Sequence, residues 1–109
     1  MQVQLGFELK LLYFLVMSAV LLAIGVYGVL TRRHLVHILL SIELILNAAL
    51  INLIAFSAFT TPDKMTGQMF AVFIIVVAAC EVGVGLAIIL SVYRKKNTVD
   101  INNINILKW

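Results

Sequence analysis

Three long apolar runs, separated by short polar connections, dominate the chain. The runs cover residues 11–30, 35–59 and 69–93. A helix needs roughly 20 apolar residues to cross the hydrocarbon core of a membrane, so each run is long enough to span it. Strands of a membrane barrel would need about 10 residues of alternating polarity, a pattern that is absent from all of these runs. The pattern predicts an all-α integral membrane protein with three transmembrane helices.

We expect residues 1–109 to form a single three-helix membrane domain. TRRH joins the first two runs, and TTPDKMTGQ joins the second and third, with Pro62 and Gly67 as the expected turn residues. A polar tail, residues 94–109, follows the third run and is expected to be irregular. The start of the chain has neither a basic segment nor a small-residue cleavage site before the first run. We therefore interpret that run as a retained helix and not as a signal peptide.

The composition excludes a soluble domain. Hydrophobic residues make up 63% of the chain and charged residues 12%, whereas soluble domains are about half apolar and a quarter charged. The net charge is +3, but the basic residues flank the apolar runs, so they do not suggest binding to nucleic acid. The single cysteine, Cys80, excludes an internal disulfide, and we expect it to be a small packing residue.

The distribution of lysine and arginine predicts the orientation in the membrane. Arg32 and Arg33 lie between the first two runs, and RKK begins the tail. The other connection carries a single lysine beside an aspartate. With three spans, both basic clusters fall on the same side, which the positive-inside rule makes the cytoplasmic side. The predicted topology has the N-terminus outside and the C-terminus in the cytoplasm.

Glutamates interrupt two of the apolar runs, Glu43 in the second and Glu81 in the third. An ionised side chain at the centre of a membrane helix costs about 2.5–3.5 kcal/mol, and burial favours the neutral form of a carboxylic acid. These two runs contain no lysine or arginine, so a cationic partner has to come from another chain. One such glutamate could be a polar anchor for a neighbouring helix. A pair at near-middle depths is better explained by ion or proton handling.

Residues near each glutamate define its helix face. Asn47 follows Glu43 by four residues, so it shares that face and could hydrogen-bond the carboxyl group. Glu81 shares a face with Ala78 and Gly85, which leave room for a water molecule or a close partner helix. Measured from the cytoplasmic helix ends, Glu43 is about 12 Å deep and Glu81 about 18 Å deep. Transfer of a proton through one or two waters then requires that the two faces meet.

Other polar residues have weaker assignments. His34 and His37 are expected to be interfacial groups at the cytoplasmic boundary, or to help protons reach Glu43. Ser41 and Asn52 are expected to hydrogen-bond between helices. A stripe of small residues on the third run has the spacing of close helix packing: Ala79, Gly83, Ala87 and Ser91. Aromatic residues suited to interfacial anchoring are Tyr13, Tyr27, Tyr93 and Trp109.

Enzyme chemistry is not indicated by any motif in the sequence. We find no Gly-rich phosphate loop, no His/Cys metal constellation and no nucleophile with a base at hand. We therefore expect no catalytic residue, no metal site, and no bound nicotinamide, flavin or iron–sulfur cluster in this chain.

Read in order, the segments GVYG, TRR, SIELILNA, GQMFAVF, AACEVGVGLAI, YR and ILKW are similar to a known family. The chain closely resembles the NuoK-type (4L-type) membrane subunit of proton-translocating NADH:quinone oxidoreductase, the complex I family. The resemblance covers nearly the whole chain. The third helix of that family usually reads AAAEAAIGLA, where this chain has AACEVGVGLA. The departure concerns the packing around Glu81.

The resemblance implies a membrane-arm subunit of a proton-pumping NAD(P)H:quinone oxidoreductase. Glu43 and Glu81 would belong to the proton-translocation path coupled to quinone reduction, with Asn47 as a supporting polar group. Arg32 and Arg33 match the basic cytoplasmic loop of the family, which affects coupled activity. The subunit would be non-redox, with no catalytic centre of its own.

The resemblance also implies partners, cofactors and a location. The partners would be antiporter-like and quinone-proximal membrane subunits, together with membrane lipid. NAD(P)H or another electron donor, FMN, iron–sulfur clusters and quinone would be bound in the assembled complex and not by this chain. We expect a bacterial inner membrane, with a thylakoid or mitochondrial inner membrane as alternatives.

Other functions stay open at this point. Subunits of multi-subunit cation/proton antiporters and of membrane-bound hydrogenases share the fold and ancestry of this family. Small multidrug transporters have a similar length and a membrane glutamate. They have four spans, however, with the glutamate in the first, whereas the first run here carries no charge. A passive scaffold within the complex is a further alternative.

Overall fold

The computed structural model describes residues 1–60, 62–97 and 100–101. These residues form three helices: α1 (Gln2–Thr31), α2 (Leu35–Thr60) and α3 (Thr66–Lys96). All three are long and apolar enough to cross a membrane. The predicted all-α membrane fold with three spans is therefore confirmed, while the sidedness of the termini remains a prediction.

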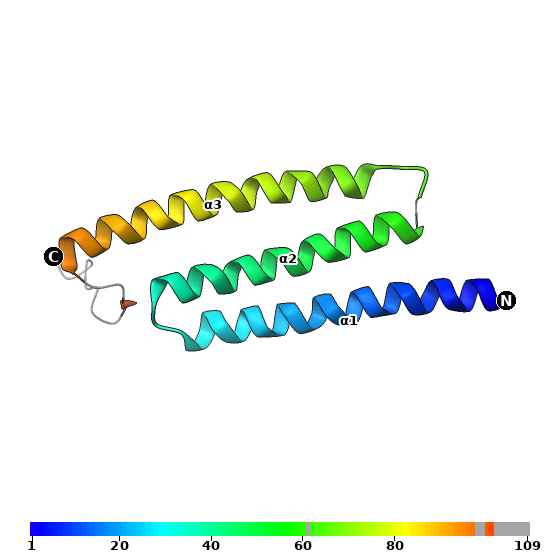
Figure 1. Ribbon diagram of the computed structural model, residues 1–109, viewed down its shortest axis with the longest axis horizontal. Helices are drawn as coiled ribbons and strands as arrows, with labels where there is room; N and C mark the ends of the chain where they lie inside the picture. Colours follow the sequence, from blue (N-terminus) through cyan, green and yellow to red (C-terminus); the bar gives the residue numbers. More distant parts are fainter. Residues whose placement is uncertain (61, 98–99, 102–109) are drawn as a thin grey trace.

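The helices lie side by side in a single layer, with α2 between α1 and α3 (Figure 1). The molecule measures 65 × 25 × 17 Å, so its thinnest dimension is less than the diameter of two helices, each about 10–12 Å across. The start of α1 and the end of α3 lie at opposite ends of the layer, and the α1–α2 connection lies at the same end as the last turn of α3 (Figure 1). Such a layer exposes two broad faces to its surroundings.

The first helix begins well before the apolar run that predicted it. α1 starts at Gln2. The charged residues Glu8 and Lys10 end the apolar run on its N-terminal side, but the helix continues through them. The ring of Phe7 packs edge-on against Phe59 of α2, with 4.7 Å between ring centroids. This contact gives the early turns of α1 a partner in the same layer.

The third helix extends into the segment that we expected to be an irregular tail. α3 ends at Lys96, and its last turn carries Arg94, Lys95 and Lys96. Cations at a helix C-terminus interact favourably with the helix dipole. Asn97 then adopts a left-handed conformation with φ 56° and donates its backbone N–H to the Tyr93 carbonyl, which is a common way to end a helix. Residues 98–99 and 102–109, including Trp109, lie outside the described residues.

The α2–α3 connection corrects the predicted role of Gly67. Pro62 lies in the turn, as predicted, but Gly67 lies in the first turn of α3. A Cβ atom added to Gly67 would collide with the side chain of Ser57 in α2 and lie 2.8 Å from the Leu53 carbonyl. This glycine therefore allows the two helices to approach closely, and it does not supply a turn conformation.

The buried residues of the layer are small. A small residue lets two helix backbones approach closely, which is how helices pack in membranes. Most large apolar side chains therefore point out of the layer, towards lipid or neighbouring chains. The residues buried in the helices are Ser18, Gly25, Gly28, Ser41, Ala48, Ala55, Ser57, Ala71 and, as the one large residue among them, Ile89.

The α1–α2 contact tests the predicted hydrogen bonds between helices. The Ser18 hydroxyl donates to the side-chain oxygen of Asn52 at 2.5 Å, so the prediction for Asn52 is confirmed. The Ser41 hydroxyl instead donates to the His37 carbonyl of its own helix at 2.8 Å. Ser41 still contacts α1, because it packs directly against Gly28.

Candidate functional site

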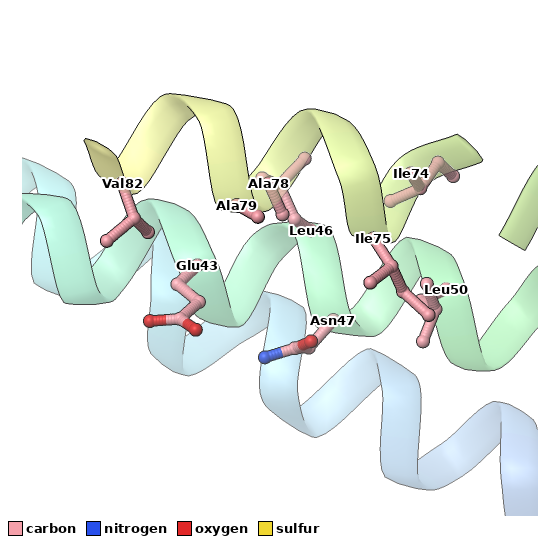
Figure 2. Close-up of a pocket in the computed structure, with 9 residues that line it drawn as sticks. All are labelled: Glu43, Leu46, Asn47, Leu50, Ile74, Ile75, Ala78, Ala79 and Val82. Atoms are coloured by element: carbon pink, nitrogen blue, oxygen red, sulfur yellow. The ribbon is translucent and has the colours of Figure 1, made fainter. Parts of the chain in front are cut away.

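Glu43 lies on an open groove between α2 and α3 (Figure 2). The groove has a volume of about 430 Å³. Glu43 and Asn47 project from the same side of α2, as their spacing predicts, and both are exposed in the isolated chain. The remaining lining is apolar: Leu46 and Leu50 from α2, with Ile74, Ile75, Ala78, Ala79 and Val82 from α3.

Glu81 lies on a second groove, of about 530 Å³, also between α2 and α3. Glu81 and its neighbour Cys80 are both exposed there. Cys80 is therefore not a packing residue within this chain. The other lining residues are Leu39 and Ile42 from α2, with Val76, Val77, Val84, Gly85 and Ile88 from α3.

The two grooves lie on opposite sides of the α2–α3 contact and share no lining residue. Consecutive residues on α2 show why. Ile42 lines the Glu81 groove and Glu43 lines the other one, because adjacent helix positions are turned by about 100°. The two carboxyl groups therefore open on opposite faces of the helix layer.

A small void in the α2–α3 contact is lined by both glutamates. The void has a volume of about 10 Å³, and both Glu43 and Glu81 line it. A cavity needs roughly 10–15 Å³ of such volume to hold one water molecule. The sequence left open whether the two glutamate faces meet, and in the structure Glu43 and Glu81 both contribute to the lining of this void, whose volume is at the lower limit for one water. The apolar lining consists of Leu39, Ile42, Leu46, Ala78 and Val82.

Small residues beside Glu81 have separate roles in this contact. The sequence suggested that Ala78 and Gly85 leave room for water or a partner helix. Ala78 lines the void, whereas the space at Gly85 is occupied by Leu39 of α2, whose Cδ1 would lie 3.0 Å from an added Cβ. Sequence reasoning missed Leu39 and Val82, because nothing distinguishes them from the other apolar residues of the spans.

The two basic clusters come together at one end of the layer. The backbone N–H of Ile101 donates to the Arg33 carbonyl at 3.2 Å, and Asp100 forms an antiparallel bridge with His34. The chain after α3 thus returns to the connection that carries Arg32 and Arg33. The rings of His34 and His37 lie near each other at the same end, with centroids 4.9 Å apart. This arrangement agrees with the parity argument behind the predicted orientation.

The stripe of small residues on α3 is not buried by α2, although Ala79 lines the Glu43 groove. Ala79, Gly83, Ala87 and Ser91 are all exposed. A Cβ atom added to Gly83 would meet nothing within 4 Å. The close packing that this spacing favours therefore does not occur within this chain. Among the described residues, no group of three His, Cys, Asp or Glu side chains is placed to hold a metal ion.

Comparison with known proteins decides the family. The sequence model for NADH-ubiquinone/plastoquinone oxidoreductase chain 4L matches residues 13–109. The chain belongs to this family. The resemblance stated from the sequence is thereby confirmed, and it favours the quinone oxidoreductase over the antiporter, hydrogenase and multidrug transporter alternatives.

Relatives cover almost the full length of the chain. The NAD(P)H-quinone oxidoreductase subunit 4L of Leptolyngbya boryana is 52% identical over 101 residues, which cover 93% of this chain and 100% of the relative. The corresponding subunit of a Synechocystis species is 48% identical over 102 residues, covering 94% and 99%. A chloroplastic subunit 4L from Staurastrum punctulatum is 48% identical over 95 residues, covering 87% and 95%.

Family membership makes this chain a membrane subunit of an NAD(P)H-quinone oxidoreductase complex, with other subunits of that complex as partners. Its three apolar helices identify a multi-pass membrane protein. The relatives come from cyanobacteria and chloroplasts, which fits a bacterial or thylakoid membrane.

Proposed function

We propose that Glu43 and Glu81 pass protons across the α2–α3 contact, as successive stations on a path coupled to quinone reduction elsewhere in the complex. One observation supports this proposal: Glu43 and Glu81 both line one small void in the α2–α3 contact, of about 10 Å³, which is at the lower limit for a single water molecule. A water hydrogen-bonded to two carboxyl groups can receive a proton from one and deliver a proton to the other.

The positions of the two grooves suggest the direction of transfer. Because Glu43 and Glu81 open on opposite faces of a layer one helix thick, a proton moving between them crosses from one neighbouring subunit to another. An ionisable group that faces lipid is costly, so both grooves are expected to be covered in the complex. We assign a quinone-proximal subunit to one face and an antiporter-like subunit to the other.

Asn47 supports the path from the Glu43 side. Its amide lies on the same groove as Glu43, one helical turn further along α2, and can hydrogen-bond either the carboxyl group or a water beside it. Arg32 and Arg33 act separately, as the basic cytoplasmic connection that affects coupled activity.

The chain has a non-redox role in this proposal. NAD(P)H or another electron donor, FMN, the iron–sulfur clusters and quinone are bound by other subunits of the complex. The enzyme is the assembled translocase, and this subunit contributes carboxyl groups without a catalytic centre of its own.

Glutamine variants test the relay. Gln is close to Glu in shape but cannot release a proton, so Glu43→Gln, Glu81→Gln and the double variant should each lose most proton translocation per assembled complex. Translocation is measured as dye quenching in sealed membrane vesicles, and the amount of complex is quantified separately. Glu8→Gln, which changes an exposed carboxyl group on α1, is the matched control and should pump normally. Normal translocation by both single variants and the double variant would show that the chain is a scaffold.

A further inference from the structure

We propose that Ala78 is a positioning residue that keeps the void between Glu43 and Glu81 open to a water molecule. The inference rests on the proposed proton relay and adds the structural element that connects its two stations. Ala78 has no catalytic role itself, since an alanine side chain carries no titratable group.

The position of Ala78 singles it out among the lining residues. Ala78 lies three residues before Glu81 and lines both the Glu43 groove and the void. It is half-buried, and its side chain ends at Cβ. The other apolar residues around the void are all branched: Leu39, Ile42, Leu46 and Val82. Ala78 therefore has the smallest side chain among the residues that line the void.

The size of the void makes this position sensitive. About 10 Å³ is at the lower limit for one water molecule, whose share of the liquid volume is about 30 Å³. Valine at residue 78 adds two carbon atoms beside a space of that size. Such a change would exclude the water while leaving both carboxyl groups in the protein.

On one side of the void, the α2–α3 contact is filled by a side chain of α2. Towards the α1–α2 connection, Leu39 packs onto Gly85, with Cδ1 and Cγ 3.0 Å and 3.8 Å from an added Cβ. This packing fills the contact between α2 and α3 beside the void. The void at Ala78 is lined by residues of both grooves: Glu43, Leu46, Ala78 and Val82 belong to one groove, and Leu39, Ile42 and Glu81 belong to the other.

The test compares matched variants in the assembled complex. Ala78→Val should reduce proton translocation per assembled complex to the level of Glu81→Gln. Ala78→Ser should keep most of it, because a hydroxyl group can hydrogen-bond in place of part of the water. Ala87→Val makes the same change on the same helix, at a residue that lines neither glutamate groove nor the void, and should pump normally.

A second-site variant distinguishes the exclusion of water from the void from a defect in folding or assembly. Val82 lines the void beside Ala78, so Ala78→Val combined with Val82→Ala conserves the total volume and should restore translocation. The ratio of translocation rates in H₂O and D₂O should rise in Ala78→Val and return to normal in the double variant, because a hindered proton transfer becomes rate-limiting. A change that affected only assembly would alter the amount of complex and leave this ratio unchanged.

The outcomes distinguish the two proposals. If the glutamine variants lose translocation while assembled Ala78→Val pumps normally, the relay stands and the role of Ala78 is wrong. If the glutamine variants pump normally, the relay itself fails, and the role of Ala78 fails with it. Should Ala78→Val not assemble, Val82→Ile adds one carbon atom to the same void. Normal pumping by that variant would contradict the proposal, and loss of pumping would support it.

Discussion

The hydroxyl group of Ser18 in α1 lies 2.5 Å from the side-chain oxygen of Asn52 in α2. The same hydroxyl lies 2.9 Å from the Leu15 carbonyl. A serine hydroxyl has one hydrogen, so it donates to one of these oxygens at a time. Ser18 is 2% exposed, and this bond is therefore a buried polar contact that fixes the register of α1 against α2.

Loss of this contact should destabilise the α1–α2 pair. Hydrogen bonds between membrane helices contribute about 0.6 kcal/mol on average and up to about 1.7 kcal/mol. We expect Ser18→Ala and Asn52→Ala each to lower the free energy of unfolding of the purified chain within this range, measured by SDS titration in mixed micelles. Because both variants remove the same bond, their effects should not add in the double variant. Additive effects would contradict a direct bond.

Gly28 and Gly83 should respond differently to the same substitution. A Cβ atom at Gly28 would collide with the Ser41 hydroxyl and lie 2.9 Å from the Ser41 Cβ, whereas one at Gly83 meets nothing within 4 Å. Overpacking of this kind costs about 1–3 kcal/mol, so Gly28→Ala should destabilise the purified chain. Gly83→Ala is the control, and it should leave the free energy of unfolding of the purified chain unchanged or slightly higher. Equal effects of the two variants would argue against the α1–α2 contact.

The orientation can be measured with introduced cysteines. Cys80, the single native cysteine, is first replaced by alanine, and Lys64→Cys and Lys95→Cys are then made separately. The positive-inside rule places Lys95 in the cytoplasm and Lys64 outside. A maleimide that cannot cross the membrane should therefore label Lys64→Cys in intact cells and label Lys95→Cys only after the membrane is opened. The reverse pattern would overturn the predicted topology.

The charge of Arg32 should matter more than its shape. Arg32 lies in the exposed α1–α2 connection, beside the returning segment at Ile101. We expect Arg32→Ala to reduce coupled quinone reduction in membranes, and Arg32→Lys to retain most of it, since lysine keeps the positive charge. Lys64→Ala, in the opposite connection, is the matched control. An exposed charge is screened by salt, so the loss in Arg32→Ala should shrink as ionic strength rises. Equal activity of the alanine and lysine variants would argue against a role for charge.

Sequence reasoning identified the spans because the length of an apolar run is set by the thickness of the membrane. It misplaced the start of α1, since the contact between Phe7 and Phe59 joins residues that are far apart in the chain. Gly67 was assigned to a turn for a related reason: a glycine used for close approach to Ser57 looks the same in sequence as a glycine used for a turn.

The sequence by itself determined that Glu43 and Glu81 lie inside helices long and apolar enough to span a membrane, and that Asn47 shares a face with Glu43. These properties follow from counting residues along a helix, because rise and rotation per residue are nearly constant. Only the tertiary structure decided that Glu43 and Glu81 line separate grooves on opposite sides of the α2–α3 contact and both contribute to the lining of one small void between them. The rotation of one helix against another depends on which side chains interlock, such as Gly85 with Leu39 and Gly67 with Ser57. Those contacts join distant parts of the chain, and no periodicity within a single helix specifies them.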